Sequence, residues 1–234
     1  MRVALFATCL GDRLFADACA DAVRLLRKLG VEVDYPAGQS CCGQPALNAG
    51  HVPEARRMAL HTVAALDGAD YVVLPSGSCA GMLRTHYPAL LGSAAARDLA
   101  QRTYELSQFV VRVLGVSSVG HGLEGRTVAY HHGCHALREL RVRDEPLALL
   151  EGAGARVVPW EAAEECCGFG GLFSVKLPSV SVGMADRKLD TLPRADVVTS
   201  ADGGCLMQLS ARAAHRGLDL SFRHLSSVLW DAAS

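Results

Sequence analysis

Long hydrophobic runs are missing from this sequence. No stretch approaches the about 18 consecutive apolar residues of a membrane-spanning helix. The longest uncharged run, YVVLPSGSCAGML (71–83), contains proline, serine and glycine. The first residues, MRVALFATCLGDR, give one arginine and a short apolar run before a Gly-Asp break. They predict a buried strand, not a signal peptide, and we expect no transmembrane segment.

A basic excess is also missing, as are the common nucleotide and hydrolase motifs. Lysine and arginine total 23 against 24 acidic residues, for a formal net charge of -1. This balance argues against a nucleic-acid partner. The glycines of CCGFGGLF lack the G-x-G-x-x-G spacing that follows a strand in dinucleotide-binding folds, and no G-x-S-x-G nucleophile motif occurs. We therefore expect neither a nucleotide site nor a serine hydrolase.

Cysteine is what the sequence does have. The nine cysteines are Cys9, Cys19, Cys41, Cys42, Cys79, Cys134, Cys166, Cys167 and Cys205. Without an export signal, the expected location is the cytoplasm, a reducing compartment where structural disulfides are rare. The odd count and the chain length also argue against a secreted disulfide scaffold. The thiols are expected to be free, metal-bound or redox-active.

Four of the cysteines in the first half recur in the second half at nearly one offset, with a single residue of slippage. The two Cys-Cys-Gly elements start at 41 and 166, and 166 − 41 = 125. The same offset relates Cys9 to Cys134, and an offset of 126 relates Cys79 to Cys205. Chance coincidence of four rare residues is far less probable than an internal duplication. We predict two homologous cysteine-rich domains, 1–122 and 123–234, with a boundary near the Ser/Gly-rich stretch 116–126.

Each half alternates strand patterns with helix patterns. Short apolar runs predict strands at 2–7, 31–35 and 71–75 in the first half, and at 127–131, 155–160, 195–200 and 218–222 in the second. Helical periodicity over 13–30 ends in a basic turn and a glycine. Such alternation is typical of parallel sheets covered by helices. The predicted fold class is α/β, with two homologous halves and parallel-rich sheets.

The recurring cysteines follow predicted strands. Ligands of parallel α/β sheets lie beyond the carboxyl ends of the strands, so the four cysteines of each half are expected to converge on one sheet edge. They also precede helices, whose N-terminal amides favour the thiolate. Cys19 has no repeat partner and lies within the first predicted helix, so we interpret it as a structural residue.

Four convergent thiolates suit two kinds of inorganic group. They can bind zinc tetrahedrally, or they can hold an iron–sulfur cluster. Adjacent cysteines diverge from a short backbone, which favours separate irons of a larger cluster over one small ion. Core cysteines without any ligand are the remaining interpretation of a single pair, but two pairs within a repeated four-cysteine pattern argue against it.

Histidines and arginines near the cysteines are further candidates. His131, His132 and His135 flank Cys134 and could supply metal ligands or a proton relay, or simply cap a helix start. Arg13 and Arg138 match at the offset of 125, and could stabilise negative sulfurs or a carboxylate substrate, or form surface ion pairs.

The cysteine motifs carry a family resemblance. TCLGDRLF, QSCCGQPALNAGH, YHHGCHALREL, CCGFGGLFSVK and GGCLMQL together resemble the lactate-utilisation protein A family of CCG-domain proteins, which is related to the cysteine-rich subunit of heterodisulfide reductase. The resemblance spans nearly the whole chain. It implies iron–sulfur clusters of the 4Fe-4S type held by the eight repeated cysteines. It also implies a complex with a ferredoxin-like iron–sulfur protein and a third subunit that oxidises L-lactate to pyruvate.

One departure from the related proteins bears on the site. In the heterodisulfide reductase branch each motif ends in Cys-x-x-Cys, whereas Met82 and Gln208 stand at the last positions here. Five-cysteine ligation is therefore not carried over. The leading hypothesis is an iron–sulfur electron-transfer subunit of a lactate-oxidising complex. The alternatives are a zinc-binding interaction module without a redox role, and thiol–disulfide chemistry like that of heterodisulfide reductase.

Overall fold

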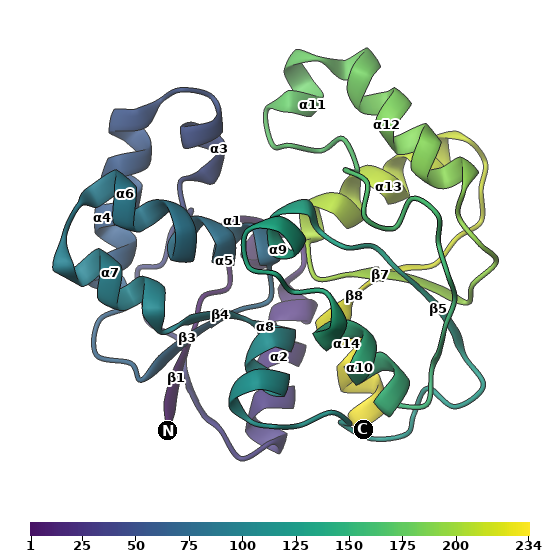
Figure 1. Ribbon diagram of the computed structural model, residues 1–234, viewed down its shortest axis with the longest axis horizontal. Helices are drawn as coiled ribbons and strands as arrows, with labels where there is room; N and C mark the ends of the chain where they lie inside the picture. Colours follow the sequence, from purple (N-terminus) through teal and green to yellow (C-terminus); the bar gives the residue numbers. More distant parts are fainter.

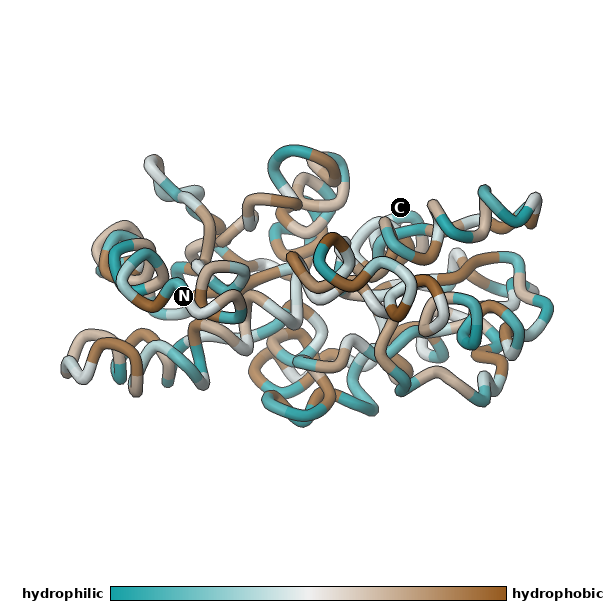
Figure 2. The backbone as a smooth tube through the Cα atoms, turned by 90° about the horizontal axis from the view of Figure 1, so that it is seen from above, coloured by the Kyte–Doolittle hydropathy of each residue, from teal (hydrophilic) through white to brown (hydrophobic).

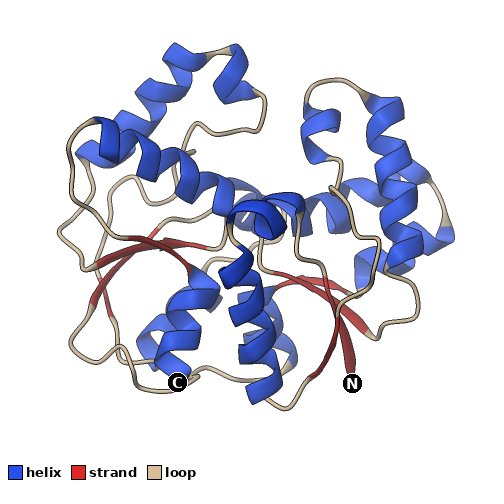
Figure 3. Cartoon of the chain, turned by 180° about the vertical axis from the view of Figure 1, so that it is seen from behind, coloured by secondary structure: helices blue, strands red, loops and turns tan.

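Two parallel four-stranded sheets form the framework of the molecule. The computed structural model describes residues 1–234. The first sheet has the order β2-β1-β3-β4, and the second has the order β6-β5-β7-β8. Their strands are β1 (Arg2–Leu5), β2 (Glu32–Asp34), β3 (Tyr71–Leu74), β4 (Thr103–Glu105), β5 (Thr127–Tyr130), β6 (Arg156–Val157), β7 (Val197–Ser200) and β8 (Phe222–His224). The predicted α/β fold class is confirmed, and the two sheets repeat one topology (Figure 3).

Register repeats as well as strand order. Val3 of β1 pairs with Tyr71 of β3, and Val128 of β5 pairs with Val197 of β7. The central strands β1, β3, β5 and β7 are buried apolar runs, as expected for strands with helices on both faces. The carboxyl ends of all four lead into the cysteine-bearing segments.

Helices connect the strands in both halves. In the first half they are α1 (Cys9–Leu14), α2 (Ala16–Lys28), α3 (Gln44–Asn48), α4 (Val52–Ala65), α5 (Gly77–Gly81), η1 (Met82–His86), α6 (Tyr87–Leu91), α7 (Ala94–Gln101), α8 (Leu106–Gln108) and η2 (Phe109–Val113). In the second they are α9 (Cys134–Arg138), α10 (Asp144–Gly152), α11 (Phe173–Lys176), α12 (Pro178–Asp190), α13 (Gly203–His215) and α14 (Leu225–Ala233). None of these helices is both long and apolar enough to cross a membrane.

The two halves share one central core. Helices α2, α8, α10 and α14 lie between the sheets (Figure 1). The helix after the last strand of each half packs on the first long helix of the other half: α14 against α2, and α8 against α10. Leu25 of α2, Leu149 of α10 and Leu229 of α14 are fully buried members of one apolar cluster. The sheets are therefore held in one relative orientation by a common layer of helices.

The outer faces are covered separately. Helices α4, α6 and α7 cover the first sheet, and α12 and α13 cover the second (Figure 1). Helical turns at the periphery of the molecule carry both hydrophilic and hydrophobic positions (Figure 2), as expected for helices with one face on a core and one in solvent. The carboxyl edges of the sheets remain between the two covers, which is where the cysteines lie.

A buried glutamate is the last residue of β4, the edge strand of the first sheet. Glu105, the last residue of β4, is 0% exposed and caps α8: its Oε2 accepts hydrogen bonds from the Ser107 hydroxyl and from the Gln108 amide. Its Oε1 has no hydrogen-bond partner. Burial raises the pKa of Glu105 to about 7.

Replacing Glu105 with glutamine is expected to remove a pH-dependent loss of stability. The folded pKa of about 7 lies above the ordinary 4.5. The stabilising contribution of the proton is thus complete below about pH 4.5 and is lost as pH rises through about 7. Glu105→Gln should match the parent chain near pH 4, and should be more stable by about 3 kcal/mol above about pH 8. Urea unfolding at both pH values measures this, and an equal difference at both would contradict it.

Candidate metal centre

In the first half, three loops after β1, β2 and β3 bring four thiols together. Cys9 begins α1, Cys41 and Cys42 lie in the loop before α3, and Cys79 lies in α5. The sulfur atoms of Cys9 and Cys41 are 3.5 Å apart, and those of Cys42 and Cys79 are 3.4 Å apart. The predicted convergence of these residues at one sheet edge is what the structure shows.

The second half repeats the arrangement. Cys134 begins α9, Cys166 and Cys167 lie in the loop after β6, and Cys205 lies in the first turn of α13. The Cys167 and Cys205 sulfurs are 3.0 Å apart. Backbone amides reinforce this loop: Gly168 N lies 3.4 Å from Cys166 Sγ, and Phe169 N lies 3.5 Å from Cys167 Sγ. These amides stabilise negative sulfur.

The glycine of each Cys-Cys-Gly element is required by its backbone. Gly43 has φ 85° and Gly168 has φ 86°, in the left-handed region that side chains disfavour. A Cβ on Gly43 would lie 3.2 Å from the Ala55 carbonyl oxygen, and one on Gly168 would lie 2.5 Å from that of Ser181. The chain therefore turns sharply after each cysteine pair and passes close to α4 or α12.

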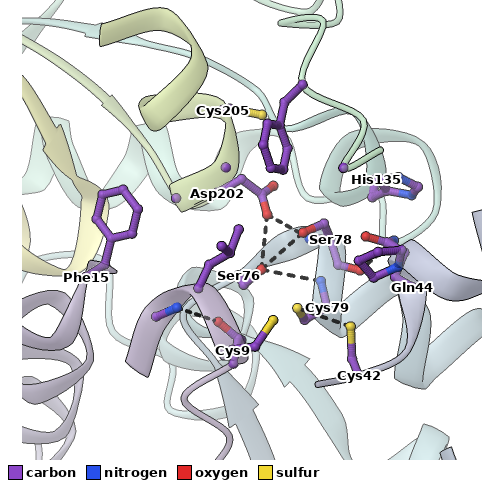
Figure 4. A pocket seen from close by; sticks show the side chains of 18 of the residues that line it. Cys9, Phe15, Cys42, Gln44, Ser76, Ser78, Cys79, His135, Asp202 and Cys205 are labelled. Atoms are coloured by element: carbon purple, nitrogen blue, oxygen red, sulfur yellow. Dashed lines mark hydrogen bonds between the residues drawn. The ribbon is translucent and has the colours of Figure 1, made fainter. Parts of the chain in front are cut away.

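All eight repeated cysteines line one cavity. This space of about 200 Å³ lies between the halves, where the two sets of thiols face each other. Residues of both halves, from Cys9 to Cys205, surround it (Figure 4). The sequence predicts one converging edge in each half. The structure adds that the two edges share a single interior, because the common helix layer holds the sheets together.

In each set, the first cysteine of the adjacent pair has a lowered pKa. Hydrogen bonds from the thiols of Cys42 and Cys9 hold the pKa of Cys41 well below its ordinary value. Hydrogen bonds from Cys134 and Cys167 do the same for Cys166. The donating thiols have raised pKa values, because the hydrogen bond and burial both favour their neutral forms. Each set thus holds one thiolate ready, and a cation would displace the remaining protons.

Asp202 connects the two halves at the cavity, and the sequence reasoning missed it. It is 4% exposed and immediately precedes α13. Its Oδ1 accepts hydrogen bonds from the Ser76 hydroxyl at 3.1 Å and from the Ser78 amide at 2.9 Å, both at the N-terminus of α5 (Figure 4). A signal was available in the offset of 126, which pairs Ser76 with Asp202 just before the last cysteine of each set.

His131 lies behind the second set of thiols. It is 0% exposed. One of its ring nitrogens and the sulfur atoms of Cys167 and Cys205 all lie within 4.8 Å of one another. Burial lowers the pKa of His131 to about 3, so the imidazole is neutral. Lys188, which the sequence reasoning did not single out, is also fully buried and donates hydrogen bonds to the carbonyls of Ala162, Ala163 and Glu165.

His135 lines the cavity itself and points toward a carboxylate. Its Nδ1 lies 2.7 Å from Glu139, which also accepts from His86 at 3.2 Å. The hydrogen bond to Glu139 raises the pKa of His135. This group joins α9 of the second half to η1 of the first.

The remaining candidates lie away from the cavity, or line it without belonging to either set of four thiols. The Arg13 side chain is 84% exposed and lies 3.7 Å from Asp12, and Arg138 lines a separate surface depression with Arg141 and Arg143. Cys19 lines the cavity but donates its thiol to the Ala7 carbonyl at 3.3 Å. Met82 is fully buried in the core, the Gln208 amide donates to the Ser181 hydroxyl, and neither residue lines the cavity.

The donor set fits a thiophilic metal group. Eight thiols around one space, two of them with lowered pKa values, match the ligands of zinc and of iron–sulfur clusters. The orphaned Nε2 of His131 is a further donor beside the second set. Hard cations such as Mg²⁺ and Ca²⁺ require oxygen ligands, which the walls do not offer in number.

Fold and site together define a duplicated cysteine-rich domain. The family model of the cysteine-rich domain, CCG, matches residues 3–84 and 128–210. The chain belongs to the lactate utilization protein A family. "Lactate utilization protein A" of Geobacillus sp. (strain WCH70) is 44% identical over 236 residues, covering 98% of this chain and 99% of that protein. The protein of the same name from Geobacillus kaustophilus (strain HTA426) is 45% identical, covering 98% of each chain.

Solved structures add little to this assignment. Arylmalonate decarboxylase matches at a TM-score of 0.30 and 17% identity, covering 99% of this chain and 91% of that one. A likeness at this level supports no argument about function.

Proposed function

We propose that this chain is an iron–sulfur electron-transfer subunit of a complex that oxidises L-lactate to pyruvate. One observation carries the proposal: two repeated sets of four thiols line a single buried cavity. The first set is Cys9, Cys41, Cys42 and Cys79, and the second is Cys134, Cys166, Cys167 and Cys205. The proposed domains 1–122 and 123–234 each contribute one set.

An iron–sulfur cluster at either set would accept and release single electrons. The residues of this chain would set the chemical environment of such a cluster. Cys41 and Cys166 provide thiolates without prior deprotonation, since neighbouring thiols donate to them. The amides of Gly168 and Phe169 donate to sulfur and so stabilise negative charge there. Burial of Cys42, Cys167 and Cys205 keeps water from the sulfurs.

The lactate part of the proposal rests on the relatives. Several proteins named "Lactate utilization protein A" align over 98% of this chain. Oxidation of L-lactate to pyruvate releases two electrons and two protons, which require acceptors. We propose a ferredoxin-like iron–sulfur protein and a third subunit as the partners that remove and pass on these electrons in the cytoplasm.

A zinc-binding interaction module is the second candidate, because the thiols of each set approach one another in pairs. Thiolates about 2.3 Å from a tetrahedral zinc ion lie about 3.8 Å from one another. The observed pair separations of 3.5, 3.4 and 3.0 Å are shorter than that value, and the one group of three metal-ligand atoms within 4.8 Å of one another is that of His131, Cys167 and Cys205. The adjacency of the cysteines favours a larger cluster.

Metal analysis separates these candidates. The chain, purified without oxygen, should be brown and should contain iron and acid-labile sulfide in stoichiometric amounts, with an EPR signal on reduction. A colourless chain with stoichiometric zinc would refute the electron-transfer role. Deleting the gene in its host should abolish growth on L-lactate where no other lactate dehydrogenase is present, and unimpaired growth would refute the substrate.

A further inference from the structure

The two thiol sites differ at one equivalent position. The amide of Phe6 donates to the Val73 carbonyl at 3.0 Å, and that of His131 donates to the Thr199 carbonyl at 2.8 Å. Phe6 and His131 therefore occupy the same place after β1 and β5, and both are 0% exposed. The first site has a phenyl ring there, whereas the second has an imidazole.

The hydrogen bonds of His131 fix its tautomer. Its Nδ1 lies 3.1 Å from the Ala163 carbonyl oxygen, which can only accept. Nδ1 therefore carries the proton, and Nε2 presents a lone pair. Nε2 is buried and has no hydrogen-bond partner. A buried acceptor without a donor is unfavourable, so a group that binds this lone pair would stabilise the site.

The imidazole lies beside two thiols, because one of its ring nitrogens and the sulfurs of Cys167 and Cys205 all lie within 4.8 Å of one another. Since Nδ1 donates to Ala163, Nε2 is the ring nitrogen free to bind a group held by these sulfurs. Metal-binding histidines usually donate their other ring N–H to a carbonyl or carboxylate, which orients the ring. Here the accepting carbonyl is itself held in place, because the amide of His132 at 3.1 Å and the Lys188 ammonium at 3.3 Å also donate to it.

We propose that His131 is a metal ligand of the second thiol site and binds through Nε2 beside Cys167 and Cys205. The inference rests on the proposed function, because it adds a donor to a site that function requires. The first site is then all-sulfur, and the second carries nitrogen as well. Lys188 is a positioning residue, since it acts on the ring through the Ala163 carbonyl.

The test uses the full chain in a background that keeps only the second site. Cys41 and Cys42 are both replaced by serine, and the protein is loaded anaerobically with iron and sulfide. Pulsed EPR of the reduced protein, with and without ¹⁵N-histidine, detects nitrogen bound to the metal. A chelator then measures the rate of iron release. Circular dichroism melting shows that each variant is folded.

His131→Phe copies the residue of the first half and should lose the nitrogen coupling and release iron at least about tenfold faster. His131→Cys should restore slow release without the coupling. His132→Phe is the matched control and should keep both, because the His132 ring packs on Tyr130, with ring centroids 4.8 Å apart. Iron bound without nitrogen coupling, at a release rate that His131→Phe leaves unchanged, would overturn the inference alone. A parent chain that binds no metal would overturn the proposed function with it.

Discussion

Replacing Cys167 with serine is expected to abolish metal binding at the second site and leave the first intact. Cys167 is 2% exposed, and its thiol donates to the sulfur of Cys205 at 3.0 Å. Serine keeps the shape but binds soft metals poorly, since its hydroxyl ionises far less readily than a thiol. About half of the metal of the parent chain should remain. Elemental analysis and the absorption spectrum of anaerobically purified protein measure this loss.

Cys19→Ser provides the control for that experiment. Cys19 is also buried and lines the same cavity, yet its thiol donates to the Ala7 carbonyl and it belongs to neither repeated set. Its replacement should leave the metal content unchanged. Equal metal loss in both variants would indicate a general effect on the cavity, and full metal content in Cys167→Ser would contradict the assignment of the second site.

The fold class and the sheet edges follow from local patterns. Buried strands such as β1 and β5 are short apolar runs, and the offset of 125 relates them directly. The last strand of each half is less visible: β4 spans only Thr103–Glu105, and β8 begins at Phe222, whereas the apolar pattern predicts 218–222. Strands of three residues carry too little periodicity to be separated from a helix start. Their positions depend on pairing with β3 and β7.

The single cavity could not be predicted from the repeat. Each set of cysteines is positioned by contacts within its own half, so sequence spacing reveals each set separately. Their meeting depends on α14 packing against α2, a contact between residues about 200 apart that no local pattern encodes. The same holds for Asp202, whose partners Ser76 and Ser78 belong to the other half. The role of Lys188 could not be predicted for a different reason: a lysine on an amphipathic helix ordinarily faces solvent, and its burial does not show in the sequence.

Replacing Lys188 with methionine is expected to loosen the loop that carries the second pair of cysteines. Lys188 is 0% exposed, and its ammonium donates to the carbonyls of Ala162, Ala163 and Glu165 just before Cys166. It also lies 4.5 Å from the centre of the Trp160 ring. Methionine fills similar volume but removes all three hydrogen bonds and leaves the Glu165 carbonyl without a donor, whereas the amides of Glu165 and His132 still donate to the carbonyls of Ala162 and Ala163.

Two opposing effects set the size of this loss. Burial lowers the pKa of Lys188 to about 8, so removing the charge relieves about 3 kcal/mol of desolvation. Losing three hydrogen bonds from a charged donor costs about 1.5–3 kcal/mol each, and losing the cation–π contact costs about 1–2 kcal/mol more. The net destabilisation is expected to be about 3 kcal/mol, concentrated in residues 162–168. Urea unfolding gives the total, and faster amide hydrogen exchange in that loop gives the location.

The repeat supplies a matched control for Lys188→Met. Gly43 approaches Ala55 and Met58, and Gly168 approaches Ser181 and Met184, so α4 and α12 correspond at an offset of 126. At that offset, Thr62 of the first half is the equivalent of Lys188. Thr62→Val changes an equally buried position of the first half and should alter stability by less than about 1 kcal/mol. If Lys188→Met lost no more stability than Thr62→Val and left the loop protected from exchange, the lysine would not be what holds the second pair of cysteines in place.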